Sequence, residues 1–430
     1  MDSSSPQPPA SVTDLRINAL GFACFVLATA WVLRDGREVS PLTASALLMG
    51  AYAAPIVLLD LLVRRVHQRP STGLAWNRPL ALDPARLATK LLGFAACLGS
   101  VGAVYFLAPE YQGSFYDDFY AFLWWLGPAA ALAAVPWFAW MDGRMAEPRD
   151  AYWHLGRLLL GDREVDLRRI ADLARGWVVK GFFVPLMYTY LCNNITDLRR
   201  LTASDPTTWL GVYDALWSFG FLTDITITTT GYLLTLRLLD THLRSAQPSM
   251  TGWVVALVCY QPFWSLISAQ YIAYDNGYAW GEWLEGTPWL KALWAVVLLG
   301  TLVVFSGSTL TFGVRFSNLT NRGVITGGFY RYTKHPAYIS KCVSFWMICI
   351  PFIAHDGLYT MARDCTWLAS ICVVYWLRAR TEEQHLSEDP DYVRYALWMN
   401  EHGLFAPLGR WIPLLRYRPP EDQPPPKRRQ

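Results

Sequence analysis

The chain has 430 residues, of which 53% are hydrophobic and 15% aromatic, and its formal net charge is +3 at pH 7. So small a net charge excludes proteins that bind nucleic acid through a strongly basic composition. The apolar residues arrive in blocks of membrane-spanning length, which excludes an ordinary soluble multidomain protein. The sequence therefore predicts an all-α fold, a polytopic transmembrane helical bundle.

Hydropathy predicts about ten spans, at residues 18–33, 43–63, 88–107, 119–140, 176–193, 211–236, 251–274, 290–313, 338–354 and 357–377. Residues 1–289 would hold the first seven, whose role the sequence leaves open. Residues 290–415 would form a second unit that carries most of the chemically interesting residues. The Pro- and Lys/Arg-rich tail at 416–430 has the composition of a disordered segment.

The distribution of Lys and Arg predicts the orientation. If the N-terminus and every second loop face one side, that side holds 29 of these residues and the opposite loops hold 6. Positive charge gathers on the cytoplasmic side of membrane proteins. We therefore expect an even number of spans, both termini in the cytoplasm and an integral multi-pass protein of the bacterial inner membrane.

Three features of the chain need separate interpretation. The loop at 150–175 is amphipathic and predicts an interfacial helix. The span at 211–236 is polar and contains Asp224, which suits either helix–helix hydrogen bonding or a cavity for an acceptor headgroup. The eight cysteines lie in or beside spans without paired ligand spacing, so we expect neither disulfides nor a metal site.

The tract from 322 to 338 contains Lys334-His335-Pro336 directly before a predicted span. Proline suits the first turn of a helix, so Pro336 should begin this span. Lys334 and His335 would then lie at the positive helix end with Tyr338 within one turn, where an anionic group could bind. The alternative is that Lys334 extends to lipid headgroups and His335 caps the helix.

A second cluster follows the last span, with Arg378, Arg380, Glu382 and Glu383 on one predicted helix. Carboxylates beside the membrane suit the hydroxyls or ammonium of a polar cofactor, although an exposed Arg378–Glu382 pair could be surface decoration alone. Asp389-Pro390-Asp391 should end this helix. The rings of Tyr392 and Tyr395 could then cover a base.

These motifs resemble the isoprenylcysteine carboxyl methyltransferase family and its bacterial membrane-bound relatives. The resemblance covers about residues 290–410, in the order Arg-Gly-x-x-Thr-x-Gly-x-Tyr-Arg-Tyr-Thr-Lys-His-Pro-x-Tyr, a helical hairpin, Arg-x-Arg-x-Glu-Glu and Pro-x-Tyr-x-x-Tyr. Two positions depart from the family pattern: Lys334 replaces the usual arginine, and Ser340 stands where glycine is frequent.

The resemblance implies an S-adenosylmethionine-dependent methyltransferase that acts on a lipid-like or lipidated acceptor from the bilayer, with its site facing the cytoplasm. It assigns the cofactor to Tyr332, His335, Pro336, Tyr338, Glu382 and Glu383. It makes Arg331, Lys334, Arg378 and Arg380 candidates for holding an anionic acceptor or the cofactor's carboxylate. Two alternatives remain open, a sterol-reductase-like NADPH-dependent membrane oxidoreductase and a non-enzymatic transporter.

Overall fold

The computed structural model describes residues 8–203, 208–274, 280–354 and 356–420. Within this part of the chain the structure is almost entirely helical, with one short antiparallel strand pair, which confirms the all-α class. Five described segments are long and apolar enough to cross a membrane: Leu15–Arg34, Pro41–Leu62, Pro84–Leu107, Ser114–Arg144 and Pro288–Arg315.

Fifteen α-helices are described: α1 (Leu15–Arg34), α2 (Pro41–Leu62), α3 (Pro84–Leu107), α4 (Asp117–Arg144), α5 (Ala151–Leu159), α6 (Leu167–Ala203), α7 (Trp209–Leu233), α8 (Met250–Leu257), α9 (Phe263–Leu266), α10 (Trp280–Trp283), α11 (Pro288–Phe312), α12 (Pro336–Cys349), α13 (Leu358–Leu386), α14 (Pro390–His402) and α15 (Ala406–Trp411). The strands are β1 (Ser245–Ala246) and β2 (Thr320–Asn321).

Most predicted spans coincide with a helix, but two differ from expectation. The span expected at 251–274 is not one helix, because α8 ends at Leu257 and the chain then turns through Pro262 before α9. Proline has no N–H to donate to a continuing helix. The span expected at 338–354 is the 14-residue α12, shorter than the ~20 residues that cross a bilayer unaided.

Local sequence explains where several helices begin. Proline occupies the first turn of α2, α3, α11, α12 and α14, where its missing N–H costs nothing. Asp83 and Asp389 precede α3 and α14, and each side chain accepts a hydrogen bond from a backbone N–H of the first turn. Both α12 and the break before α14 therefore follow the sequence prediction.

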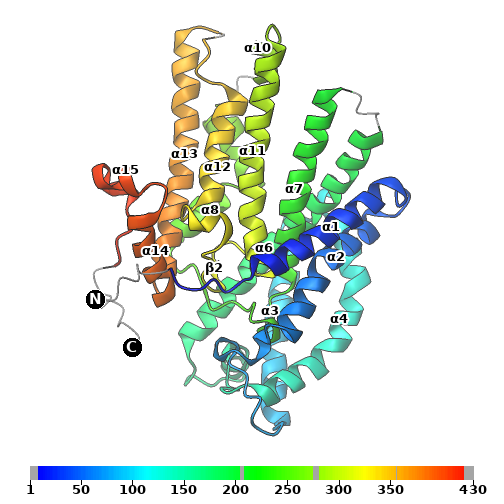
Figure 1. Ribbon diagram of the computed structural model, residues 1–430. Helices are drawn as coiled ribbons and strands as arrows, with labels where there is room; N and C mark the ends of the chain where they lie inside the picture. The colour runs from blue at the N-terminus through cyan, green and yellow to red at the C-terminus, as the bar shows by residue number, and fades with distance from the viewer. Residues whose placement is uncertain (1–7, 204–207, 275–279, 355, 421–430) are drawn as a thin grey trace.

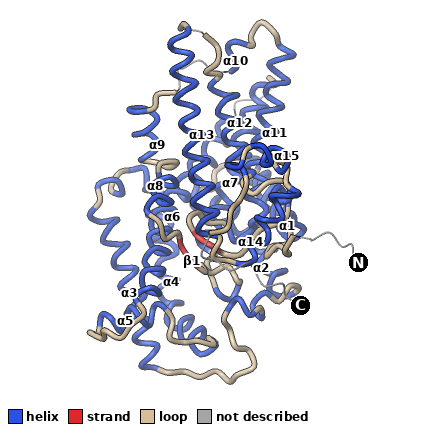
Figure 2. The backbone as a smooth tube through the Cα atoms, turned by 90° about the vertical axis from the view of Figure 1, so that its left-hand side faces the viewer, coloured by secondary structure: helices blue, strands red, loops and turns tan. Residues whose placement is uncertain are grey.

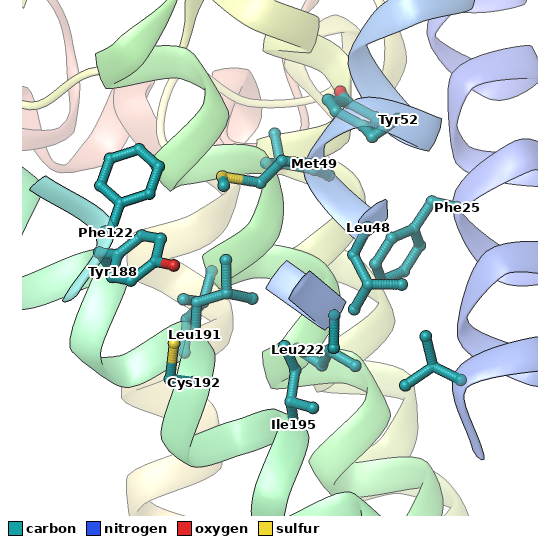
Figure 3. Close-up of a cluster of buried hydrophobic side chains, with 14 of the residues drawn as sticks. Phe25, Leu48, Met49, Tyr52, Phe122, Tyr188, Leu191, Cys192, Ile195 and Leu222 are labelled. Carbon is teal, nitrogen blue, oxygen red and sulfur yellow. The ribbon is translucent and has the colours of Figure 1, made fainter. Parts of the chain in front are cut away.

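A buried apolar cluster joins α1, α2, α6 and α7. Figure 3 shows its centre, where Phe25 and Leu48 face Leu191 and Leu222. Phe122 from α4 stacks on Tyr188 of α6 with ring centroids 4.4 Å apart. The Tyr188 hydroxyl lies 2.7 Å from the Ser45 hydroxyl, so this buried polar group has a partner. The cluster fixes α7, which carries Asp224, against the N-terminal helices.

The amphipathic loop predicted at 150–175 contains α5 and the start of α6. Helix α5 packs so closely on α3 that a Cβ on Gly93 would lie 2.2 Å from the Tyr152 carbonyl oxygen. A Cβ on Gly156 would lie 2.0 Å from the Thr89 carbonyl oxygen. Only glycine permits this approach of two backbones, so α5 is anchored to α3.

Two buried arginines connect the N-terminal helices to the C-terminal part. Arg315 forms an ion pair with Asp240, with Nη2 and Oδ2 3.0 Å apart. Arg322 donates to five backbone carbonyls, those of Gly231, Leu234, Thr241, Val314 and Phe316, at 2.6–3.3 Å. Because both guanidinium groups are nearly inaccessible, they serve to hold the segment after α7 against the segment after α11.

Helices α11, α12 and α13 stand side by side at the C-terminal part of the molecule (Figure 1). The strand pair β1–β2 lies near the lower end of α13 in Figure 2, and Ser245 of β1 is 2.9 Å from the imidazole of His385. The N-terminal segment reaches the same region, since the Val12 N–H donates to the Val324 carbonyl and the Thr326 hydroxyl to the Pro9 carbonyl. The described N-terminal segment and the 322–338 tract therefore lie side by side.

Candidate functional site

The start of α12 meets the end of α13, and this contact brings together the two charged clusters seen in the sequence. Pro336 is buried as the first residue of α12, and His335 is its N-cap residue. The His335 side chain makes no capping bond. Its Nε2 instead lies 3.1 Å from Glu383 Oε1, so capping does not explain this histidine.

Glu383 is the centre of the cluster. Its Oε1 lies 2.5 Å from Lys334 Nζ, and its Oε2 accepts a 3.0 Å hydrogen bond from Arg380. Only 6% of the Glu383 side chain is exposed. Burial raises the pKa of this carboxyl, but bonds from His335 and Lys334 outweigh it and lower the pKa to about 2. Glu383 is thus an ionised anchor whose two oxygens are both engaged.

The Lys334 side chain is buried against Glu383 and does not extend to lipid headgroups. Its side chain is 12% exposed, and its ammonium lies 5.5 Å from the centroid of the Tyr417 ring. Burial lowers the pKa of Lys334, and the neighbouring Glu383 carboxylate opposes that shift. The interpretation of Lys334 as a lysine extended to the membrane surface is therefore wrong.

Glu382 is more exposed than Glu383 and has fewer bonding partners. Its Oε2 accepts a 2.7 Å hydrogen bond from the Tyr338 hydroxyl, and its side chain is 39% exposed. Within the described residues its Oε1 has no hydrogen-bond partner. Since a carboxylate oxygen can accept two bonds, the more exposed Glu382 keeps more acceptor capacity for a ligand than the buried Glu383, whose two oxygens already have three basic partners.

Arg378 lies over the Tyr338 ring. Its guanidinium carbon is 5.1 Å from the centroid of that ring and 5.4 Å from the centroid of the Tyr260 ring. It donates to Asn318 Oδ1 at 2.6 Å. No Arg378–Glu382 ion pair is present among the described residues, so surface pairing does not account for this arginine.

Two cavities meet at this cluster, with Lys334, His335 and Tyr338 in the wall of both. The first, here called the α7-side cavity, has a volume of about 310 Å³ and is also lined by Asp224 and Glu382. Its wall includes polar or aromatic groups from three helices and two connecting segments: Tyr260, Thr309, Asn318, Lys341 and Arg378. The second, the α14-side cavity, has a volume of about 350 Å³ and is also lined by Arg380, Glu383 and residues of the C-terminal helices: Tyr375, Trp376, Asn400, Phe405 and Arg416. Both volumes fall at the lower end of the range for small-molecule pockets, about 300–1,000 Å³.

The other residues predicted for the site lie either in a cavity wall or elsewhere in the protein. Tyr332 is 62% exposed and lines the α14-side cavity. Arg331 is exposed and lines neither cavity, and Pro336 serves to start α12. Ser340, where the resembling family often has glycine, is buried and donates to the Ala337 carbonyl.

Tyr392 and Tyr395 do not cover a ligand site. Both are buried in an apolar cluster with Val324, Met399 and Tyr417, and the Tyr395 hydroxyl donates to the Tyr330 carbonyl. They line neither cavity. Their spacing on α14 turns both rings toward the core, so the prediction that they cover a base is wrong.

The structure shows which bonds are made by the polar side chains of α7, the polar span predicted at 211–236. Four threonines of α7 donate to carbonyls four residues earlier in their own helix: Thr223, Thr226, Thr229 and Thr230. Asp224 instead faces the α7-side cavity and accepts a hydrogen bond from Thr309 of α11. Within the described part of the chain, these four threonines therefore bond within α7 and not to a neighbouring helix, whereas Asp224 makes a helix–helix hydrogen bond in the wall of the cavity.

Several wall residues were not singled out in the sequence. Lys341 lies one helical turn beyond Tyr338, so the periodicity of α12 could have indicated it. Asn318, Asn400 and Arg416 come from separate segments, and only the folded chain brings them to the cavities.

Comparisons of the chain with protein-family models, with curated proteins and with solved structures find no match.

Proposed function

We propose that the protein is an integral membrane methyltransferase that uses S-adenosylmethionine and a lipid-like or lipidated acceptor. The observation that carries the proposal is the contact between Lys334, His335 and Tyr338 of one motif and Glu382 and Glu383 of the other. In the resembling family these two motifs belong to one site. Their meeting across two cavities is what a two-substrate enzyme needs.

The α14-side cavity fits the cofactor. Lys334, Arg380 and Arg416 offer positive charge for its carboxylate, and Trp376 and Phe405 offer aromatic surface for its adenine. The rings of Tyr338 and Tyr375, with centroids 5.9 Å apart, offer faces that favour a cationic sulfonium. The cofactor itself supplies a methyl group on a positively charged sulfonium, and the neutral thioether that remains after methyl transfer is a good leaving group.

The α7-side cavity fits the reactive end of the acceptor. Arg378 and Lys341 on its wall can orient a carboxylate, and Asp224 or Glu382 can orient a hydroxyl or ammonium. A carboxylate acceptor needs alignment and exclusion of water more than proton transfer. A hydroxyl acceptor needs a base as well, for which His335 and Glu382 are both available in the wall of this cavity.

Topologically, we propose about ten spans with both termini in the cytoplasm of a bacterial inner membrane. The five long apolar helices would be joined by α6, α7, α12, α13 and the interrupted α8–α9 segment. The excess of Lys and Arg on one set of loops supports this arrangement. The site would then face the cytoplasm, the compartment that supplies S-adenosylmethionine.

Calorimetry on the purified protein tests the proposal. S-adenosylmethionine, or its demethylated product, should bind with micromolar-range affinity, a free energy of about −8 kcal/mol. Binding of reduced nicotinamide dinucleotide in the absence of binding by either sulfur ligand would instead support the sterol-reductase-like alternative. If no cofactor binds, a non-enzymatic transporter becomes the better interpretation. Mass spectrometry of membrane lipids and proteins, with and without the enzyme, would identify the methylated acceptor.

A further inference from the structure

A third and larger cavity lies among the N-terminal helices, away from the two cavities of the proposed site. This α4-side cavity has a volume of about 1090 Å³. Its walls come from α3, α4, α5, α6 and the segment 235–245 after α7. Nothing in the proposed methyl transfer requires such a space.

In one part of the cavity wall, the charged side chains form ion pairs with other residues of the chain. Lys90 is almost fully buried, and its Nζ lies 2.8 Å from Asp142 Oδ1 and 3.3 Å from Asp150 Oδ2. Arg86 pairs with the same Asp142 at 2.7 Å. Arg169, at the rim, pairs with Glu147 and Asp166. These charges have partners within the chain and do not call for a ligand.

Two other cations in the wall have no such partner. Lys180 of α6 and Arg237 of the segment after α7 form no ion pair with any described residue. The Lys180 ammonium lies 5.6 Å from the centroid of the Trp177 ring, and Arg237 donates through Nη1 to the Thr72 carbonyl at 3.2 Å. Burial lowers the pKa of Arg237, with Asp150 opposing the shift. A partly buried cation with no ion pair of its own is costly unless a ligand provides one, and the Asp150 carboxylate near Arg237 is already paired with Lys90.

The part of the wall formed by α4 is apolar. Helix α4 contributes small residues to the cavity, Ala130, Ala133 and Ala134, followed by Trp137 and Phe138. This helix is one of the five long enough to cross a membrane and is mostly exposed, with Trp124 and Leu132 four-fifths uncovered. It lies at the edge of the molecule in Figure 1. A ligand on this wall would therefore be next to the hydrocarbon of the bilayer.

We propose that the α4-side cavity binds an anionic phosphate-bearing lipid. Lys180 and Arg237, which both line the cavity, offer positive charge to its phosphate, and its acyl chains lie along the alanine face of α4 toward the bilayer. The volume suits a headgroup with part of its chains, and the pairing of two cations with an apolar wall selects an amphiphile over a free anion.

Binding to the purified full-length protein in a neutral detergent tests this site. The ligands are dioctanoyl phosphatidic acid, dioctanoyl phosphatidylcholine and inorganic phosphate, measured by native mass spectrometry and calorimetry. Phosphatidic acid should bind at least tenfold more tightly than either of the others. Lys180→Gln and Arg237→Gln should each weaken it about tenfold, the usual effect of removing one charge-assisted contact. Ala134→Phe, which fills the apolar wall, should weaken it as well.

Two controls separate binding from folding. Arg200→Gln removes an exposed cation at the far end of α6 and should leave lipid affinity unchanged. Without lipid, Lys180→Gln should melt at the same temperature as the parent or higher, because an uncompensated charge is removed. Unchanged phosphatidic acid affinity in both cation variants would overturn the proposal, as would equal binding of inorganic phosphate. None of these measurements depends on methyl transfer, so failure here leaves the proposed function standing.

Discussion

Lys334, just before α12, and Glu383, near the end of α13, form an ion pair with Nζ and Oε1 2.5 Å apart. They are 49 positions apart in the sequence, and α12 and most of α13 lie between them. Because His335 and Arg380 bind the same carboxylate, one buried anion holds three basic groups in fixed positions. The border between the two cavities therefore depends on Glu383.

Glu383→Gln should destabilise the protein by about 3 kcal/mol, since removing one partner of a buried pair leaves the others uncompensated. Glu382→Gln, at a more exposed position with one described hydrogen bond, should cost about 1 kcal/mol or less. Melting temperatures in one detergent provide the comparison. Equal losses for the two variants would show that Glu383 is not the anchor.

The same carboxylate predicts a pH dependence. Its pKa falls from 4.5 to about 2 in the folded protein, so the stabilisation is complete above pH ~4.5 and is lost as pH falls toward 2. The melting-temperature difference between the parent and Glu383→Gln should be constant near neutrality and shrink below about pH 4.5. A difference that does not change between pH 7 and pH 3 would contradict the assigned ionisation.

Much of this arrangement could be predicted from the sequence, because it depends on local rules. Hydropathy found the apolar helices, and the proline rule placed the first residue of α12 at Pro336. The roles of Glu382 and Glu383 could not be separated in this way. Adjacent residues on a helix point about 100° apart, and only the packing of α12 on α13 decides which one is buried. The break near Pro262 was missed because the run at 251–274 is apolar on average, and hydropathy does not report a missing N–H.

Arg322 should prove to be a structural residue despite its place in the charged tract. It is buried and donates to five carbonyls, and the shorter lysine side chain has a single donor group that cannot reach them all. Arg322→Lys should therefore lower stability by more than about 3 kcal/mol. Arg331→Lys, at an exposed position lining neither cavity, is the matched control and should melt like the parent. A stable Arg322→Lys protein would refute this role.

Topology can be measured directly. Single cysteines placed in the N-terminal segment, in 70–80 and in 420–430 should all react from the cytoplasmic side, because the Lys and Arg distribution is 29 to 6 in favour of these loops. The contact of Val12 with Val324 already places the N-terminal segment beside the site. Labelling of the tail from the opposite side would overturn the even number of spans.

The two cavities predict a division of labour that separate measurements can test. His335→Ala and Glu382→Gln should each weaken S-adenosylmethionine binding about tenfold or more, since His335 lines the cofactor cavity and Glu382 holds the hydroxyl of Tyr338, which lines it too. Asp224→Asn should spare cofactor affinity, because Asp224 and its hydrogen-bond partner Thr309 both line only the α7-side cavity, and should alter acceptor turnover instead. Calorimetry for the cofactor and a methyl-transfer assay for the acceptor distinguish these outcomes. If affinity is unchanged in both His335→Ala and Glu382→Gln, the cofactor does not bind at this border, even if the protein transfers methyl groups.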